Sequence, residues 1–359
     1  MRAPVERASL APGVEIPRII NGCWQLASDH RRRRQSLAES TANLQRLAEL
    51  GLTTFDCADI YTGVEERLGA LRRHWTSGGR DPGALRIHTK FVPDAGRLAT
   101  IDRSYVREIL DRSRERLGAP RLDLVQFHWW DFAVPGWLET GRWLDELRAE
   151  GRIRLLGVTN FDVPHLERLL AAGLPIASNQ VQYSLLDRRP AAAMAELCRQ
   201  HGVRLLTYGA LAGGFLSDRW LDEEDPGMDV GNRSLTKYRL IIDEFGGWEA
   251  FQRLLGSLHR IARKHRVSIA NVATRWVLDR PGVTAVILGA SDAAHGEDNL
   301  RTFSFALDAR DRQRIAALLA DHPGPDGDIY SVERIPGGRH ASIMKTDLNR
   351  APSAPKDMC

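Results

Sequence analysis

Short apolar, β-branched runs alternate with longer stretches in which apolar residues recur three and four positions apart along most of the chain. The first pattern predicts buried strands, and the second predicts amphipathic helices. Eight such runs can be counted, and they begin at Ile19, Thr53, Arg86, Leu122, Ile153, Ile176, Val203 and Val283. A helix-like segment follows each run, and the one after the third run ends at Gly118, a residue type that commonly terminates helices.

Eight alternating units without a break in composition predict an α/β fold, a closed parallel (β/α)8 barrel of the TIM type, rather than an open doubly wound sheet. No G-x-G-x-x-G motif follows any of the runs, so a Rossmann dinucleotide-binding half is not supported. We expect a single barrel domain over residues 1–359. It should carry an irregular inserted loop at about 212–248 and an irregular tail from about 323 that packs over the surface or mouth of the barrel.

The composition is that of a folded globular protein, with 43% hydrophobic and 27% charged residues. The longest apolar runs are far shorter than a membrane span, and the N-terminus lacks the apolar region of a secretion signal. We therefore expect a cytoplasmic protein without a membrane partner. The widely spaced cysteines form no C-x-x-C pair, which argues against a metal site or a disulfide framework.

The formal net charge of +4 arises mainly from arginines scattered among acids, a pattern typical of solvated helix faces. No nucleic-acid-binding motif accompanies them, so we expect no nucleic-acid partner. The one dense cluster, His30–Arg34, follows the first predicted strand and should lie at the barrel mouth. There Arg31–Arg34 would permit an acidic or phosphorylated substrate, while a solvated loop remains the alternative.

Polar residues stand where several predicted strands end, which is where barrels of this kind carry their chemistry. Asp56 ends the second strand and Tyr61 follows five residues later, while Lys90 and His128 end the third and fourth strands. Burying an unpaired lysine or aspartate costs several kcal/mol, so we expect these side chains to satisfy one another.

The chemistry of these four residues suits a carbonyl or alcohol oxygen. A lysine ammonium near a phenol should lower the pKa of Tyr61 from about 10 and make it a proton donor near neutral pH. Asp56 would keep Lys90 charged, and a neutral His128 would hydrogen-bond the substrate oxygen. Because the set contains no nucleophile, we expect a bound hydride carrier to supply the electrons.

The segments FDCADIYTGVEERLG, HTKF, VQFHW, GVTNF and SNQVQYSLLDR occur in an order and spacing that resembles the aldo-keto reductase superfamily. The resemblance covers nearly all of Ile19 to Asn299. It implies an NAD(P)H-dependent (β/α)8 oxidoreductase with a catalytic tetrad of Asp56, Tyr61, Lys90 and His128. Tyr61 would then be the general acid in reduction and the general base in oxidation.

The resemblance also implies a cofactor, NADP with NAD possible. Thr159, Asn160 and Gln180 would hydrogen-bond the nicotinamide carboxamide, and Tyr208 would stack on its ring. The full set of implied cofactor contacts is Gly22, Cys23, Trp24, Asp56, Thr159, Asn160, Gln180, Tyr208, Leu211, Gly289, Ala290, Ser291, His295, Asp298 and Asn299. His295 stands where many NADPH-specific members have an arginine, and histidine is mostly neutral at pH 7, so the preference between NADP and NAD stays open.

Three tryptophans, Trp24, Trp129 and Trp130, fall at strand ends and are expected to form an aromatic wall for a small aldehyde, ketone or sugar. Core packing is the alternative for at least one of them. Two other functions compete with a reductase. One is a cofactor-binding regulatory subunit with little turnover, as in the channel-associated branch of the family. The other is a Schiff-base aldolase using Lys90, which an adjacent acid disfavours because that lysine must be readily neutral.

Overall fold

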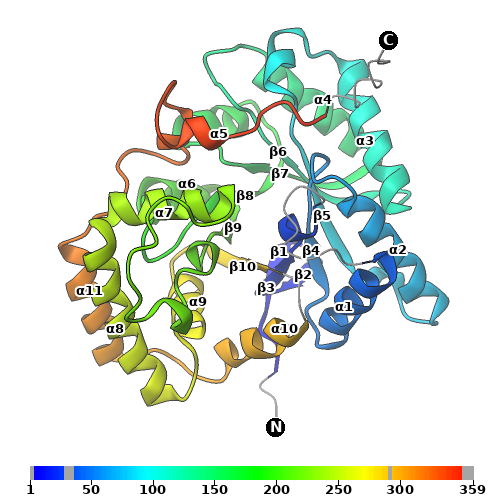
Figure 1. The fold of residues 1–359 in the computed structure, drawn as a ribbon. Helices are drawn as coiled ribbons and strands as arrows, with labels where there is room; N and C mark the ends of the chain where they lie inside the picture. Colours follow the sequence, from blue (N-terminus) through cyan, green and yellow to red (C-terminus); the bar gives the residue numbers. More distant parts are fainter. Residues whose placement is uncertain (1–3, 28–35, 290–292, 350–359) are drawn as a thin grey trace, which may run out of the picture.

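The computed structural model describes residues 4–27, 36–289 and 293–349. Eight parallel strands close into a barrel in the order β10-β3-β4-β5-β6-β7-β8-β9 (Figure 1). The predicted (β/α)8 class is confirmed, and each of the eight predicted runs overlaps one barrel strand. These strands are β3 (Ile19–Gly22), β4 (Thr54–Asp56), β5 (Arg86–Phe91), β6 (Leu122–Phe127), β7 (Ile153–Thr159), β8 (Ile176–Gln182), β9 (Arg204–Tyr208) and β10 (Val283–Gly289).

Helices follow the strands and cover the outside of the barrel (Figure 1). They are α1 (Leu37–Glu49), α2 (Val64–Ser77), α3 (Arg103–Leu117), α4 (Trp137–Ala149), α5 (Val163–Ala171), α6 (Ala193–His201), α9 (Ile269–Leu278) and α10 (Ala293–Leu300). Helix α3 shows how local chemistry sets the bounds. The Asp102 side chain accepts a hydrogen bond from the Tyr105 amide at its start, and Gly118 ends the helix with a φ of 57°.

The register of the strands brings polar residues of neighbouring strands to one level. Asp56 in β4 lies beside His88 in β5, and Lys90 lies beside Gln126 in β6. Because all eight strands are parallel, their carboxyl ends meet at one mouth of the barrel.

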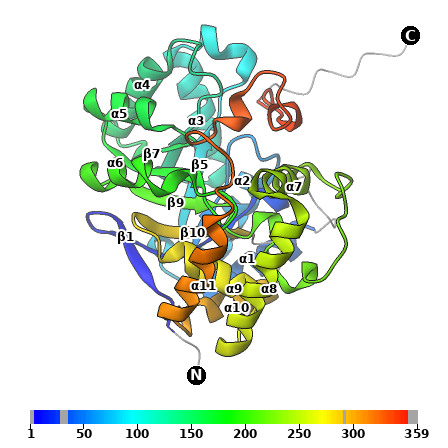
Figure 2. The same cartoon turned by 90° about the vertical axis from the view of Figure 1, so that its left-hand side faces the viewer.

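An antiparallel hairpin of β1 (Arg7–Ala11) and β2 (Val14–Pro17) covers the opposite end. Its Leu10, Val14 and Ile16 pack with Leu124 and Leu206 of the barrel in a small core of their own. Figure 2 shows β1 on one side of the barrel and α7 on the other. The sequence pattern did not predict this hairpin.

The segment after β9 is more regular than expected. It contains helix α7 (Arg233–Phe245), followed by α8 (Gly247–His265). The Asn232 side chain caps α7 by accepting from the Leu235 amide, and one face of the helix is buried. The expectation of an irregular insertion over 212–248 is therefore wrong for the residues of α7.

Beyond α11 (Ala309–Ala320), the described residues up to 349 form two short 3-10 turns, Val332–Arg334 and Ala341–Ile343. This tail, orange to red in Figure 1, runs back across the barrel on the side of α7.

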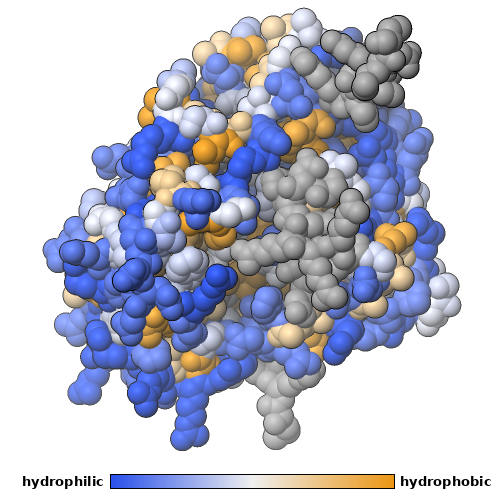
Figure 3. All heavy atoms as spheres, viewed as in Figure 1, coloured by the Kyte–Doolittle hydropathy of each residue, from blue (hydrophilic) through white to orange (hydrophobic). Residues whose placement is uncertain are grey.

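The face seen in Figure 3 is mostly hydrophilic, with small groups of hydrophobic residues between the polar ones. Within the described ranges, the large hydrophobic side chains that stand exposed are Leu37, Met228 and Ile335. No helix of the described chain is long and apolar enough to cross a bilayer.

Candidate active site

The structure brings the predicted tetrad together at the barrel mouth. The Lys90 Nζ lies 2.5 Å from Oδ1 of Asp56 and 5.2 Å from the ring centre of Tyr61. His128 directly follows β6, and its ring is close enough to Lys90 for that charge to affect its pKa. Asp56, Lys90 and Tyr61 thus lie together, and His128 stands at the end of the neighbouring strand β6.

Asp56 and Lys90 are both buried, and their polar atoms are well satisfied. The second carboxylate oxygen of Asp56 accepts from the amide groups of Gln126, at 2.9 Å, and Gln180, at 2.7 Å. Lys90 also donates to the carbonyl of Cys57 at 2.8 Å. Sequence reasoning missed Gln126, although a polar residue inside the apolar run LDLVQF was a usable signal.

Burial and charge act in opposite directions on the ionisable groups here. Burial is the largest single effect on Lys90 and would lower its pKa, but the charge and hydrogen bond of Asp56 and the interaction with Tyr61 together outweigh burial and raise that pKa, so Lys90 stays charged. For Tyr61, burial is the larger effect and raises the pKa to about 12, although the charge and hydrogen bond of Lys90 lower it. The expectation that Lys90 brings the pKa of Tyr61 below 10 is therefore wrong for this structure.

The imidazole of His128 is neutral, and its proton can be placed. Burial is the main cause that lowers the pKa of His128 to about 3, and the charge of Arg334 is the second. Its Nδ1 lies 3.2 Å from the carbonyl oxygen of Thr159, which can only accept, so Nδ1 carries the proton. The other ring nitrogen, Nε2, is left as a hydrogen-bond acceptor.

Two of the predicted tryptophans flank this site. The Trp24 ring meets Tyr61 edge to face at 4.7 Å, and the Trp130 ring meets His128 in the same way at 4.4 Å. Trp129 instead points into the core, where it is fully buried against Phe127 and donates to a backbone carbonyl. The expectation that Trp129 lines the substrate pocket is therefore wrong, because its side chain is enclosed in the hydrophobic core.

The C-terminal tail adds groups that the sequence did not predict. The ring of Tyr330 lies 5.7 Å from that of His128. Arg334 donates to the carbonyls of Trp129, at 3.0 Å, and Asn160, at 2.9 Å, and so fixes the tail to the ends of β6 and β7. The sequence predicted an irregular tail over the surface or mouth of the barrel, but it did not predict these contacts, because the tail has no helical or strand period.

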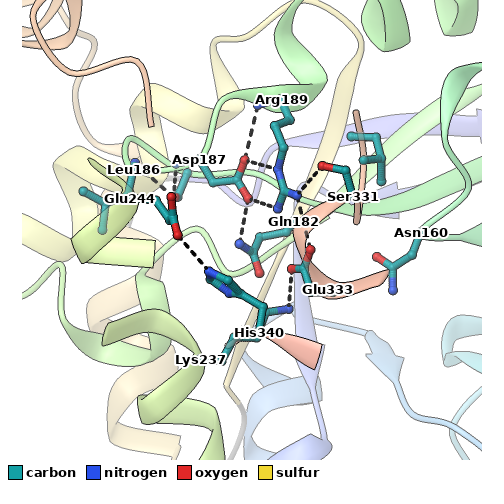
Figure 4. Close-up of polar contacts among 12 residues, drawn as sticks. Asn160, Gln182, Leu186, Asp187, Arg189, Lys237, Glu244, Ser331, Glu333 and His340 are labelled. Atoms are coloured by element: carbon teal, nitrogen blue, oxygen red, sulfur yellow. Dashed lines mark hydrogen bonds and ion pairs between the residues drawn. The ribbon is translucent and has the colours of Figure 1, made fainter. Parts of the chain in front are cut away.

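A buried ion network, which we name the mouth clasp, joins the tail to the barrel and to α7. It consists of Asp187, Arg189, Lys237 and Glu333. Arg189 pairs with Asp187 at 2.7 Å and with Glu333 at 3.2 Å, and Lys237 lies 3.4 Å from Glu333. Figure 4 shows Arg189 between the two acids, with Lys237 approaching from helix α7. Sequence reasoning missed all four.

The residues predicted to hold the nicotinamide lie together at the ends of β7, β8 and β9. The Thr159 hydroxyl donates to the Gln180 carbonyl at 3.0 Å, and the Tyr208 hydroxyl donates to Oδ1 of Asn160 at 2.9 Å. Asn160 has a φ of 59°, which turns the chain at the end of β7. Lys237 lies over the Tyr208 ring at 5.2 Å, so a stacked nicotinamide would use the opposite face. Amide, hydroxyl and ring groups of this kind fit a nicotinamide carboxamide.

The residues near β3 and β9 that were predicted to contact the cofactor differ in how accessible they are. A Cβ on Gly22 would stand 2.8 Å from the side chain of Ile287, so the strand needs glycine there for packing. Cys23 is fully buried and its amide donates to the carbonyl of Asp56. The expected ligand contact by Cys23 is thus not supported, because both its thiol and its amide are enclosed. Leu211 is half-buried in the turn after β9.

The residues predicted to bind the adenosine half lie around α10. Gly289 ends β10 beside the side chain of Gln25, and His295 is exposed on the helix. Asp298 is engaged locally, since its carboxylate accepts from Ser268 and pairs with Arg301. Asn299 is half-buried. Ala290, Ser291 and the cluster His30–Arg34 lie outside the described residues.

Comparison with known proteins assigns the family. Residues 18–320 match the model of the Aldo/keto reductase family. The chain is 26% identical over 338 residues to the aldo-keto reductase YhdN of Bacillus subtilis, covering 90% of this chain and 97% of that protein. It is 30% identical over 329 residues to protein tas of Escherichia coli, covering 81% and 92%. The match to flagellar radial spoke protein 5 of Chlamydomonas reinhardtii is 28% over 325 residues, covering 75% of this chain but only 61% of that protein.

Solved structures agree with the family assignment. A thermostable aldo-keto reductase in complex with the inhibitor epalrestat superimposes with a TM-score of 0.68 at 25% identity, covering 87% of this chain and 99% of that one. The glycerol dehydrogenase of Gluconobacter oxydans shares the fold, with a TM-score of 0.72 at 22% identity over 91% and 97% of the two chains. The chain belongs to the aldo/keto reductase family, a family of oxidoreductases, and the resemblance of its motifs is confirmed.

Proposed function

We propose that this protein is an NAD(P)H-dependent reductase of an aldehyde, ketone or sugar carbonyl that also oxidises the corresponding alcohol. The observation that carries the proposal is the position of the Lys90 ammonium, held at 2.5 Å by Asp56 and set beside the phenol of Tyr61. A buried cation next to a neutral phenol can stabilise the phenolate that remains after the proton has left.

In the reductive direction, Tyr61 donates its proton to the carbonyl oxygen of the substrate. A phenol with a pKa of about 12 is fully protonated at neutral pH and is therefore ready to act as the acid. A bound nicotinamide would supply the hydride. The Nε2 of His128 accepts from the hydroxyl group that forms, and Trp24 and Trp130 limit the access of water.

The cofactor would lie along the ends of β7, β8 and β9, held by Thr159, Asn160, Gln180 and Tyr208. On the habits of the family, we favour NADP over NAD. His295 is a weak partner for a 2′-phosphate compared with an arginine, so the preference should be small. Titration with NADPH and NADH checks this point, and equal affinities would rule out a 2′-phosphate site.

The decisive experiment follows NADPH absorbance with a panel of aldehydes, ketones and sugars, for the wild type and for Tyr61→Phe. We expect Tyr61→Phe to abolish turnover and to bind the cofactor as tightly as the wild type, because only the reacting hydroxyl is removed. Turnover that persists in Tyr61→Phe would refute the role of this residue.

A second function, a cofactor-binding structural or regulatory subunit, is suggested by the relative named as a flagellar radial spoke protein. Wild-type protein that binds NADPH but turns over no member of the panel would favour that function. The complete tetrad favours catalysis. We also propose that the insertion and the tail belong to the same single unit as the barrel, since the mouth clasp ties both to it.

A further inference from the structure

An open hollow of about 750 Å³ lies at the end of the barrel opposite to the tetrad. Helix α2, the end of α3 and the first residues of β5, β6 and β7 surround it. Its charged lining consists of five arginines and one acid, namely Arg72, Arg73, Arg86, Arg121, Arg154 and Asp123.

The strand register explains why these arginines gather. Leu122 of β6 lies beside Ile153 of β7, and His88 of β5 lies beside Leu124 of β6. Arg86, Arg121 and Arg154 therefore stand within about one residue of the same level on three adjacent strands, close to where these strands begin. The remaining two arginines, on α2, face the same hollow.

The charge of the hollow is not balanced by the protein. Its five arginines and one aspartate sum to +4, which equals the formal net charge of the entire chain, with 50 basic and 46 acidic residues. Asp123 already faces Arg72 at 3.1 Å and Arg86 at 3.9 Å, and it accepts from a backbone amide.

Three of the arginines have no counter-charge. Within residues 4–27, 36–289 and 293–349, the guanidinium groups of Arg73, Arg121 and Arg154 make no hydrogen bond and no ion pair. Other exposed arginines of the described chain are paired, as Arg107 is with Glu150 and Arg199 with Glu196, or stand unpaired on a helix face, as Arg312 and Arg314 do, whereas these three gather around one hollow. Several unpaired like charges around one hollow raise the local positive potential and attract anions.

We propose that this hollow binds a small anion with two or more phosphate groups. Guanidinium groups match phosphate oxygens in pairs, and a volume of about 750 Å³ is within the range of small-molecule sites. The lining contains no aromatic residue on which a base could stack, which favours a small polyphosphate over a single-stranded nucleic acid.

This site is separate from the proposed reductase site. Arg86 and Lys90 lie four residues apart on β5, which corresponds to about 13 Å along the strand. The two side chains are thus at different levels of the barrel, and only Lys90 is near the mouth. Binding in the hollow does not require the reductase function.

The test is calorimetric titration of the full chain with inorganic triphosphate, at about 50 mM and about 200 mM salt. We expect binding that weakens with salt, because each arginine–phosphate contact is screened. The double variant R121E/R154E should weaken triphosphate binding at least about tenfold, which is about 1.4 kcal/mol. The matched control is R312E/R314E, which replaces two exposed arginines on α11 with the same change in net charge and should bind triphosphate like the wild type.

Thermal unfolding and NADPH oxidation by the same variants separate this result from damage to the fold or to the tetrad. Both should be unchanged, because the substituted side chains are on the surface and far from Lys90. The proposal is overturned if the wild type shows no triphosphate binding, or if R121E/R154E binds as tightly as R312E/R314E. It is also overturned if a short RNA binds through these arginines while triphosphate does not.

Discussion

Two opposite effects act on the pKa of Tyr61, and burial is the larger of the two. The nearby charge of Lys90 favours the phenolate, and sequence reasoning considered only this effect. The site also removes the phenol from water, and this loss of solvation is larger, so the pKa of Tyr61 rises to about 12. A residue of this kind is prepared to donate a proton at neutral pH and is a poor base.

The pH dependence of the two directions should therefore differ. Between about pH 6 and pH 9, kcat/KM for reduction should be flat, because Tyr61 stays protonated and His128, with a pKa of about 3, stays neutral. For alcohol oxidation, kcat/KM should rise by up to about tenfold per pH unit, because only the phenolate can accept a proton. Steady-state kinetics in both directions over this range checks the prediction.

A variant of Lys90 tests how far its charge lowers the pKa of Tyr61. Lys90→Met removes the charge that lowers the pKa of Tyr61, so it should impair oxidation more than reduction. If oxidation instead reached a plateau near pH 7 in the wild type, the pKa of Tyr61 in the working enzyme would be much lower, and burial would not be the dominant effect.

At the scale of elements, the mouth clasp connects three segments that are distant in the chain. Asp187 and Arg189 follow β8, Lys237 belongs to α7, and Glu333 belongs to the tail. Burial raises the pKa of the Glu333 carboxyl, but the charges of Lys237 and Arg189 outweigh it and lower that pKa to about 2. The buried carboxylate of Glu333 thus holds the tail to two cations, in addition to the contacts that Arg334 makes with Trp129 and Asn160.

Replacing Glu333 by glutamine should release the tail. It leaves two buried cations with less compensation, and removal of one partner from a buried ion pair typically costs about 3–5 kcal/mol. We expect trypsin to cleave Glu333→Gln faster than the wild type after Arg334 and Arg339, which mass spectrometry can locate. The control is Glu244→Gln. Glu244 lies on α7, as Lys237 does, and contacts tail residue His340, but its side chain is exposed. This substitution should therefore change cleavage little. Equal cleavage of both variants would contradict the role of the clasp.

The elements predicted correctly are those whose signal is local. The barrel strands are buried on both faces, so each appears as an apolar run, and Asp56, Lys90 and His128 stand at or just after the ends of such runs. The β1–β2 hairpin was missed because β1 buries only Leu10 of its five residues and so does not appear as an apolar run. The position of Tyr330 depends on contacts that the nearby Arg334 and Glu333 make with residues far away in the sequence. No periodicity in the tail predicts these contacts.

At the scale of the whole molecule, the two ends of the barrel carry different functions in our account. The mouth holds paired and largely buried charges, whereas the opposite end holds unpaired arginines around an open hollow. Parallel strands produce this separation, because all their carboxyl ends lie on one side and all their starts on the other.

The tail also meets the segment that follows β4, at the buried carboxyl of Asp59. Its Oδ2 accepts from the Val92 amide at 3.2 Å and from the Asn349 side chain at 3.1 Å, while Oδ1 has no hydrogen-bond partner in the described part of the chain. Burial is the main cause that raises the pKa of Asp59 to about 7, and the charge of Glu65 is the second. The folded protein therefore binds a proton that the unfolded chain has already lost.

The stability of the fold should decrease as this proton is lost. Between about pH 4 and pH 7 the folded state holds more protons at this position than the unfolded state, so the free energy of unfolding falls with rising pH, by up to about 4 kcal/mol from Asp59 alone. Asp59→Asn cannot ionise and should remove this part of the slope, which urea unfolding at pH 5 and pH 8 measures. The exposed Asp321→Asn should keep the slope of the wild type. An unchanged slope in Asp59→Asn would show that Asp59 is ionised in the folded protein throughout, and that Arg112 and Asn349 stabilise its charge more than burial opposes it.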